Sequence, residues 1–147
     1  MIEIERVDHI GIRVEDLEHA MAFYEVLGFE LLRRSTNDAV AIVRNRNDVE
    51  LNLIYNANVD IEGKNILMDV GEKYPGYTHV ALRVRSMNDT LAALEAHGIA
   101  VTQGPVDFGD GHLSVFVRDP DRNVVELRGR DQDAGAVEGV VPYTPEN

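Results

Sequence analysis

The sequence predicts an α+β fold built from two tandem βαβββ modules. The main observation is an internal repeat, in which "HIGIRVEDLEHAMAFYEVLGFEL" from His9 aligns without a gap with "HVALRVRSMNDTLAALEAHGIAV" from His79. In each copy an alternating apolar pattern changes to a helical spacing, which indicates a strand followed by a helix. Short β-like segments broken by turn residues then follow both copies. The identical pairs are His9/His79, Arg13/Arg83, Val14/Val84, Ala22/Ala92, Glu25/Glu95 and Gly28/Gly98.

Each repeat predicts an amphipathic helix with a defined end. Apolar residues recur at helical spacing at Leu17, Ala20, Met21, Tyr24 and Leu27 in the first copy and at Met87, Leu91 and Leu94 in the second. Gly28 and Gly98 stand where a helix needs a residue that tolerates positive φ in order to end. Strand-like sequence resumes directly after each glycine.

Three strands are predicted after each helix. They are "FELLRRST", "AVAIVR" and "DVELNLIY" in the first module, and "AVTQG", "HLSVFVR" and "NVVELRG" in the second. Asn, Asp and Pro supply the turns between them. We expect a single domain over residues 1–128, with module one at about 1–55, a linker at about 56–76 that has room for a short helix, and module two at about 77–128. The polar tail, 129–147, is expected to be disordered or to wrap a neighbour.

Composition and charge exclude several classes of function. The 147-residue chain has a formal net charge of −12 and a sequence pI near 4.7, which argues against a nucleic-acid partner. Without cysteine there is no disulfide, thiolate metal site or thiol nucleophile, so a metal would need His, Asp, Glu or water. No segment approaches the roughly 18 consecutive apolar residues of a membrane span, and the N-terminal residues do not resemble an export signal. We expect a soluble, cytoplasmic protein without membrane partners.

Strand alternation predicts which side chains share the face of the sheet opposite the helix. In the first module Ile10, Ile12 and Val14 point to the helix, which leaves His9 and Arg13 on the far face. Leu51 and Leu53 likewise point inward and Glu50 and Asn52 outward. In the second module, His79 and Arg83 share the far face with Glu126 and Arg128. The far-face residues in the order of the chain are His9, Arg13, Glu50, Asn52, His79, Arg83, Glu126 and Arg128.

Each module therefore offers one His and one Glu on matching strand faces. A lone strand histidine or glutamate is usually structural or solvated, but the same pair at the same place in both repeats favours a functional role. Pseudo-twofold pairing of the modules would bring His9, Glu50, His79 and Glu126 to one cleft. These nitrogen and oxygen donors suit one divalent ion, namely Ni, Co, Zn, Mn or Fe, with positions left for water or substrate.

These motifs resemble the vicinal-oxygen-chelate superfamily, which contains glyoxalase I, methylmalonyl-CoA epimerase, extradiol dioxygenases, fosfomycin-resistance enzymes and bleomycin-binding proteins. The resemblance runs from residue 5 to about 128, through "DHIGIRVEDLEHAMAFYEVLGFEL", "VELNLI", "THVALRV" and "FVRDPDRNVVELRG". It implies a cupped, eight-stranded mixed sheet around a metal cleft, with His9, Glu50, His79 and Glu126 as metal ligands. It also implies a homodimer.

Within this family, the ligand at Glu50 favours some reactions over others. Extradiol dioxygenases use two His and one carboxylate so that catechol and O₂ can both bind the iron, and the metal-free binding proteins lack the four ligands. The leading hypothesis is a divalent-metal-dependent glyoxalase-type isomerase or lyase, similar to lactoylglutathione lyase, in which Glu126 or Glu50 moves the α-proton. The alternatives are an epimerase of the methylmalonyl-CoA epimerase type, an extradiol dioxygenase-like enzyme, and a non-catalytic small-molecule-binding protein.

The resemblance to glyoxalase I is incomplete at the substrate. Arg13 matches an arginine that the subfamily uses for the glutathione carboxylate, but Ile54 stands where an asparagine is expected. Asn52 shares the face of Glu50 and is the candidate replacement. The substrate is thus expected to be a small molecule, with anionic compounds and glutathione adducts among the candidates.

Three further residues are candidates for substrate binding. Arg83 and Arg128 lie on the ligand face, where they bind an anionic substrate or neutralise the two glutamates. Phe116 alternates with Val115 and Val117, so it lines the pocket or belongs to the core.

Overall fold

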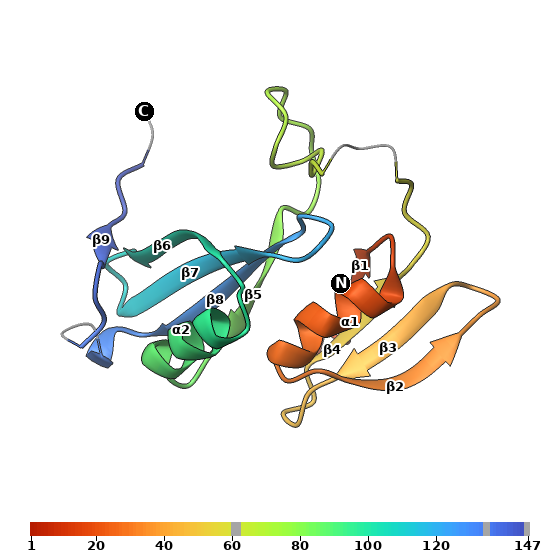
Figure 1. The fold of residues 1–147 in the computed structure, drawn as a ribbon, viewed down its shortest axis with the longest axis horizontal. Helices are drawn as coiled ribbons and strands as arrows, with labels where there is room; N and C mark the ends of the chain where they lie inside the picture. The colour runs from red at the N-terminus through yellow and green to blue at the C-terminus, as the bar shows by residue number, and fades with distance from the viewer. Residues whose placement is uncertain (60–62, 134–135, 146–147) are drawn as a thin grey trace. The chain divides into compact units, whose positions relative to one another are not determined.

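The computed structural model describes residues 1–59, 63–133 and 136–145. The chain divides into two compact units, residues 1–64 and 65–147 (Figure 1). In the described residues each unit holds one mixed sheet and one α-helix, which confirms the predicted α+β class and the βαβββ order of both modules.

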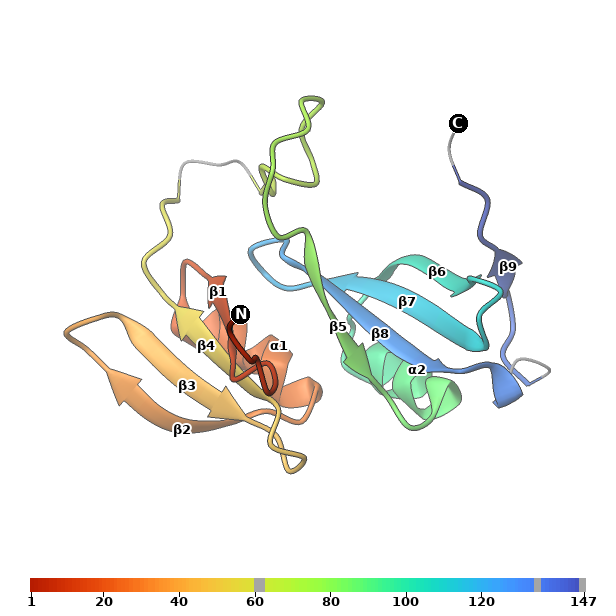
Figure 2. The same cartoon turned by 180° about the vertical axis from the view of Figure 1, so that it is seen from behind.

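The first unit has four strands in the order β1-β4-β3-β2, with β1 parallel to β4 and the other neighbours antiparallel. Helix α1 lies on one face of this sheet, and Figure 2 shows the opposite face. Leu51, Leu53, Ala41 and Val43 are fully buried, whereas their strand neighbours are not. This confirms the predicted alternation in β4. The elements are β1 (Ile10–Arg13), α1 (Leu17–Val26), β2 (Glu30–Ser35), β3 (Val40–Arg44) and β4 (Glu50–Ile54).

The second unit repeats the plan and adds one strand, in the order β5-β8-β7-β6-β9. Strand β5 is parallel to β8, as β1 is to β4, and the helix again packs on one face. The elements are β5 (His79–Arg83), α2 (Met87–Ala96), β6 (Val101–Asp107), β7 (His112–Arg118), β8 (Val124–Arg130), a 3₁₀ turn (Asp131–Asp133) and β9 (Val141–Pro142).

The two helices begin and end with matching local chemistry. Asp16 caps α1 by accepting a hydrogen bond from the His19 N–H, and Ser86 caps α2 by accepting one from the Asp89 N–H. Just beyond each helix, Gly28 and Gly98 have φ values of 88° and 67°. The glycines therefore end the helices as the sequence predicts.

The strands differ from the prediction in two respects. In the described residues they form two sheets, one of four strands and one of five. The fifth strand, β9, comes from the segment that was predicted to be a polar tail. Strand β9 pairs with β6 through Val106 and Val141, and β8 continues to Arg130. A two-residue strand carries no periodic signal, so its pairing depends on tertiary structure. The shared cupped sheet and its metal cleft stay predictions.

The linker is held to the second unit by ionic contacts. In residues 56–59 and 63–76 there are turns but no helix, contrary to the short helix considered above. Asp69 accepts hydrogen bonds from Arg118 (3.0 Å), the last residue of β7, and from Arg122 (3.2 Å) in the β7–β8 turn.

Neither α-helix of the described ranges has the length and apolar character needed to cross a bilayer.

Candidate functional site

The second unit brings His79 and Glu126 into contact. Strand β5 runs parallel to β8, with Ala81 opposite Glu126, so both side chains lie on the face away from α2. Nε2 of His79 is 3.1 Å from Oε2 of Glu126. The other carboxylate oxygen, Oε1, accepts a hydrogen bond of 2.5 Å from the Ser114 hydroxyl. Glu126 is buried, so these contacts fix its orientation in a region of limited solvent access.

Arg128 lies beside this pair but is already paired with a carboxylate. Its guanidinium donates hydrogen bonds to Asp110 and, at 3.3 Å, to the Ser114 hydroxyl, and it lies 3.7 Å from Oε1 of Glu126. Burial alone would raise the pKa of Asp110, but Arg128 and His112 outweigh this effect and the pKa lies below its ordinary value. Arg128 is therefore anchored and adds positive charge near Glu126.

A cavity of about 480 Å³ opens next to His79 and Glu126. Aromatic rings form much of its wall: Phe116 packs edge-on against His79 at 6.0 Å, and Phe108 lies 5.0 Å from Tyr143. The cavity thus combines two acid–base pairs, His79 with Glu126 and Arg128 with Asp110, with apolar surface. Its lining residues are His79, Gln103, Phe108, Asp110, Phe116, Glu126, Arg128 and Tyr143.

The first unit holds a second cluster with the same central pair. Ligand atoms of Asp8, His9 and Glu50 all lie within 4.8 Å of one another. Nδ1 of His9 is 2.6 Å from Oδ1 of Asp8, and the hydrogen bond with His9 lowers the pKa of Asp8 below its ordinary value. Glu50 forms an ion pair of 2.9 Å with Arg44, the residue opposite it on β3.

In both units the residue before the histidine contacts its Nδ1 atom. Asp8 does so for His9, and the hydroxyl of Thr78 lies 2.9 Å from Nδ1 of His79. A partner at Nδ1 fixes the orientation of the ring and leaves Nε2 for a metal, as is usual for metal-binding histidines. Nε2 of His79 is the atom that faces Glu126.

The donor atoms fit a divalent metal. Two atoms that bind one ion at about 2.0–2.2 Å lie roughly 3 to 3.4 Å apart when adjacent in its coordination shell. The separation of 3.1 Å between His79 Nε2 and Glu126 Oε2 meets this condition. Imidazole nitrogen and carboxylate oxygen are also the donors that first-row divalent metals accept.

The predicted substrate residues occupy different surroundings. Phe116 and Arg128 line the cavity beside Glu126, whereas Arg83 is exposed and does not line it. Arg13 is exposed at the end of β1. Asn52 lines a separate pocket in the first unit.

Several residues near these pairs were not predicted. Ser114 lies two positions before Phe116 on β7, so alternation would have placed it on the same face. Asp8 and Thr78 directly precede the two histidines, so their positions in the sequence could have identified them as candidates. Asp110 and Tyr143 had no usable signal, because one lies in a loop and the other follows the short strand β9.

The chain belongs to the Glyoxalase/Bleomycin resistance protein/Dioxygenase superfamily, whose family model matches residues 6–127. A relative described as a probable lactoylglutathione lyase, from Vibrio parahaemolyticus serotype O3:K6, is 33% identical over 144 residues, covering 91% of this chain and 97% of the relative.

Two solved structures share the fold. A glyoxalase/dioxygenase from Nostoc punctiforme has a TM-score of 0.66 at 20% identity, covering 85% of this chain and 90% of that one. TnmS3, an antibiotic binding protein from Streptomyces sp. CB03234, has a TM-score of 0.65 at 25% identity, covering 88% and 99%.

Proposed function

We propose that this protein is a divalent-metal-dependent lyase or isomerase of the glyoxalase type. The proposed metal ligands are His9 and Glu50 of the first unit and His79 and Glu126 of the second. The observation that carries the proposal is the contact between His79 and the buried Glu126, whose second oxygen is held by Ser114. The similarity to the Vibrio lactoylglutathione lyase supports the same reaction class.

The side chains of the second unit fit proton transfer next to a carbonyl. A bound divalent ion supplies Lewis acidity, which stabilises negative charge that develops on a substrate oxygen. Glu126 borders the cavity and accepts the α-proton, while the Ser114 hydroxyl holds its other oxygen in place. Phe108 and Phe116 line the cavity beside Glu126 and give it apolar surface.

The proposed substrate is a small α-carbonyl compound such as the hemithioacetal of methylglyoxal and glutathione. Ile54 replaces the asparagine expected for glutathione binding, so an epimerase or isomerase that acts on another small oxygenated substrate is the alternative. A homodimer in the cytoplasm is proposed with this function.

Metal analysis and turnover together test the proposal. Protein purified without chelator is expected to contain a first-row divalent metal and to convert the hemithioacetal of methylglyoxal and glutathione to the thioester. Addition of EDTA should abolish the activity, and one divalent metal should restore it. Protein that carries metal but leaves the hemithioacetal unchanged would favour the epimerase alternative, and metal-free protein would contradict the metal-dependent reaction.

A second candidate is a non-catalytic small-molecule-binding protein. It is favoured by the similarity to TnmS3, which is described as an antibiotic binding protein. This candidate predicts ligand binding that is unaffected by EDTA and by Glu126→Gln. Isothermal titration before and after chelation separates it from the enzyme.

A further inference from the structure

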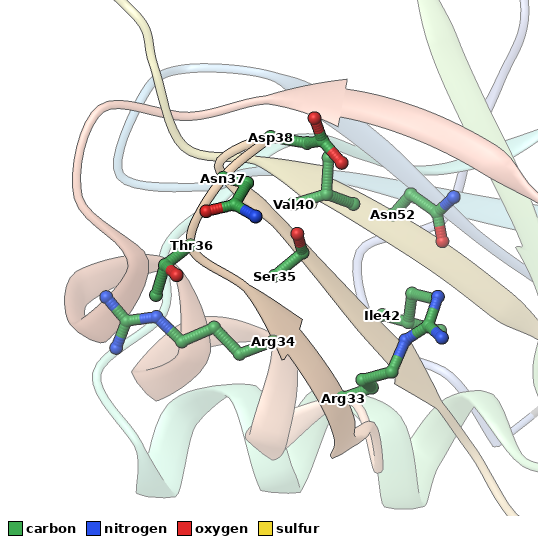
Figure 3. A pocket seen from close by; sticks show the side chains of 9 residues that line it. All are labelled: Arg33, Arg34, Ser35, Thr36, Asn37, Asp38, Val40, Ile42 and Asn52. Atoms are coloured by element: carbon green, nitrogen blue, oxygen red, sulfur yellow. The ribbon is translucent and has the colours of Figure 1, made fainter.

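A second pocket lies within the first unit, on the sheet face opposite α1. Its volume is about 570 Å³, and its walls come from β2, β3, β4 and the hairpin that joins β2 to β3 (Figure 3). Val40 and Ile42 of β3 form an apolar floor between Arg33 and Asn52, whereas residues 35–38 contribute hydroxyl, amide and carboxylate groups. The pocket is thus more polar than the aromatic cavity of the second unit.

Strand register places a cation and an amide at opposite sides of this floor. Arg33 pairs with Ile42, and Ile42 pairs with Asn52, so the three residues form one row across β2, β3 and β4. Two strand spacings separate the ends of the row by about 9–10 Å at the backbone. Figure 3 shows the Arg33 side chain directed toward Ile42, its partner on β3.

Arg33 reaches this face because of an irregularity in β2. The register shifts between Leu31, which pairs with the buried Val43, and Arg33, which pairs with Ile42. Without this bulge, strict alternation would turn Arg33 toward the helix side of the sheet. Bulges commonly redirect a side chain at functional sites.

Two polar groups of the pocket have unmet bonding capacity among the described residues. The Asn52 Oδ1 atom is buried and accepts no hydrogen bond in the part of the chain that the structure describes. Such an atom is costly, and a ligand that donates a hydrogen bond would remove the cost. In the same described ranges Arg33 has no ion pair, whereas Arg34 contacts Tyr55 through its Nε atom at 3.3 Å.

We propose that this pocket binds a small organic monoanion that carries an N–H or O–H donor and a short apolar body. The carboxylate would pair with Arg33, the body would lie on Val40 and Ile42, and the donor would reach Asn52. Asp38 borders the hairpin end of the pocket and disfavours a second negative charge.

The pocket lies near Glu50, because Asn52 and Glu50 belong to the same strand, β4. Asn52 follows Glu50 by two positions on β4, so the two side chains share a face about 6.6–7 Å apart. A ligand bound at Asn52 would therefore extend toward the proposed metal ligand. The identification of this anion as part of the substrate rests on the proposed function, but its binding does not.

The test is an NMR titration of the metal-free, full-length protein with 2-hydroxyisovalerate. We expect saturable shifts of the Asn52 side-chain amide and the Arg33 Nε–H. The neutral analogue 2-hydroxyisovaleramide should bind at least about tenfold more weakly, because it lacks the charge that pairs with Arg33. Isovalerate, which lacks the hydroxyl donor, should bind more weakly and leave the Asn52 amide largely unshifted.

Matched variants locate the binding. Arg33→Gln should weaken binding of 2-hydroxyisovalerate by about ten- to a hundredfold, while Arg46→Gln, which removes the same charge from the exposed β3–β4 turn, should not. Asp38→Asn should tighten binding. The absence of saturable shifts, or equal losses in the two arginine variants, would overturn the proposal. Because no metal is present, this result is independent of whether the protein proves to be a glyoxalase.

Discussion

The two units carry the same His–Glu pair in different surroundings. The Glu126 side chain is 9% exposed and contacts the His79 ring and the Ser114 hydroxyl. The Glu50 side chain is 16% exposed, and an exposed arginine, Arg44, neutralises it at 2.9 Å. The repeat thus preserves a contact from the preceding residue to Nδ1 of each histidine. The strand register differs, because Gly11 lies opposite Asn52 whereas its counterpart Ala81 lies opposite Glu126, and the partner of the carboxylate has diverged as well.

This difference suggests a division of roles between the two carboxylates. Ser114 and His79 orient Glu126, and the nearby guanidinium of Arg128 lies at 3.7 Å and is itself paired with Asp110. Glu126 therefore borders the cavity as an oriented proton acceptor. Arg44 instead holds one oxygen of Glu50 in a direct ion pair of 2.9 Å, which leaves that oxygen less free to reach a substrate proton. We therefore expect Glu126 to act as the base and Glu50 to act mainly as a ligand.

Exchanging each glutamate for glutamine tests this division most strongly. Glu126→Gln should lower kcat by about 10² to 10⁴-fold, because the amide keeps an oxygen donor but cannot accept the proton. Glu50→Gln should lower it less. Steady-state kinetics with metal content measured on the same samples would check this. Equal losses in both variants would mean that the carboxylates are equivalent.

Replacing the histidines, or the residues that contact their Nδ1 atoms, tests how much each unit contributes to metal affinity. Thr78→Val and Asp8→Asn should each weaken metal affinity by about 10- to 100-fold, as is typical for groups that orient a metal-binding histidine. His79→Ala and His9→Ala should weaken it further. Competition with a chelating dye measures these affinities. If Thr78→Val and Asp8→Asn bind metal as the parent does, the Nδ1 contacts are only structural.

Stability should respond differently to the partners of the two carboxylates. Ser114→Ala leaves an oxygen of the buried Glu126 without its donor and should lower the free energy of unfolding by about 1–3 kcal/mol. Arg44→Gln removes an ion pair whose arginine is 44% exposed and should cost about 0–1 kcal/mol. Urea denaturation distinguishes the two, and a larger loss in Arg44→Gln would reverse the comparison.

The smallest expected difference between the two units is in the stability of their helix caps, and it depends on pH. The hydrogen bond from the His19 N–H lowers the pKa of Asp16 below its ordinary 3.8, so the cap of α1 is fully stabilising above pH 3.8 and weakens as the pH falls through the lowered value. Ser86, which caps α2, does not titrate. The protection of amides against exchange, relative to their intrinsic rates at each pH, should therefore fall below pH 3.8 in the first turn of α1 but not of α2. Asp16→Ser should remove this dependence.

The sequence could predict features that depend on neighbouring residues, namely the face on which a strand residue lies and the residue at which a helix ends. Alternation placed Glu50, Asn52 and Glu126 on the correct faces because successive side chains of a strand must point to opposite sides. Gly28 and Gly98 likewise ended the helices, since positive φ favours glycine.

Contacts that depend on pairing between distant segments could not be predicted. The hydrogen bond from Ser114 to Glu126 requires the register of β7 against β8, and Tyr143 reaches the cavity only because β9 pairs with β6. The bulge in β2 breaks the alternation on which the prediction depends, so Arg33 was not identified.

The most direct test of the central claim is the metal content of the parent protein and of a variant that lacks both histidines, His9→Ala with His79→Ala. Both are purified without chelator, supplied with the same divalent metal, desalted and analysed by mass spectrometry. The proposed His–Glu ligands predict one ion per parent chain and none in the folded double variant. Retention of the ion in the double variant, or its absence from the parent, would contradict the claim that these pairs bind a metal.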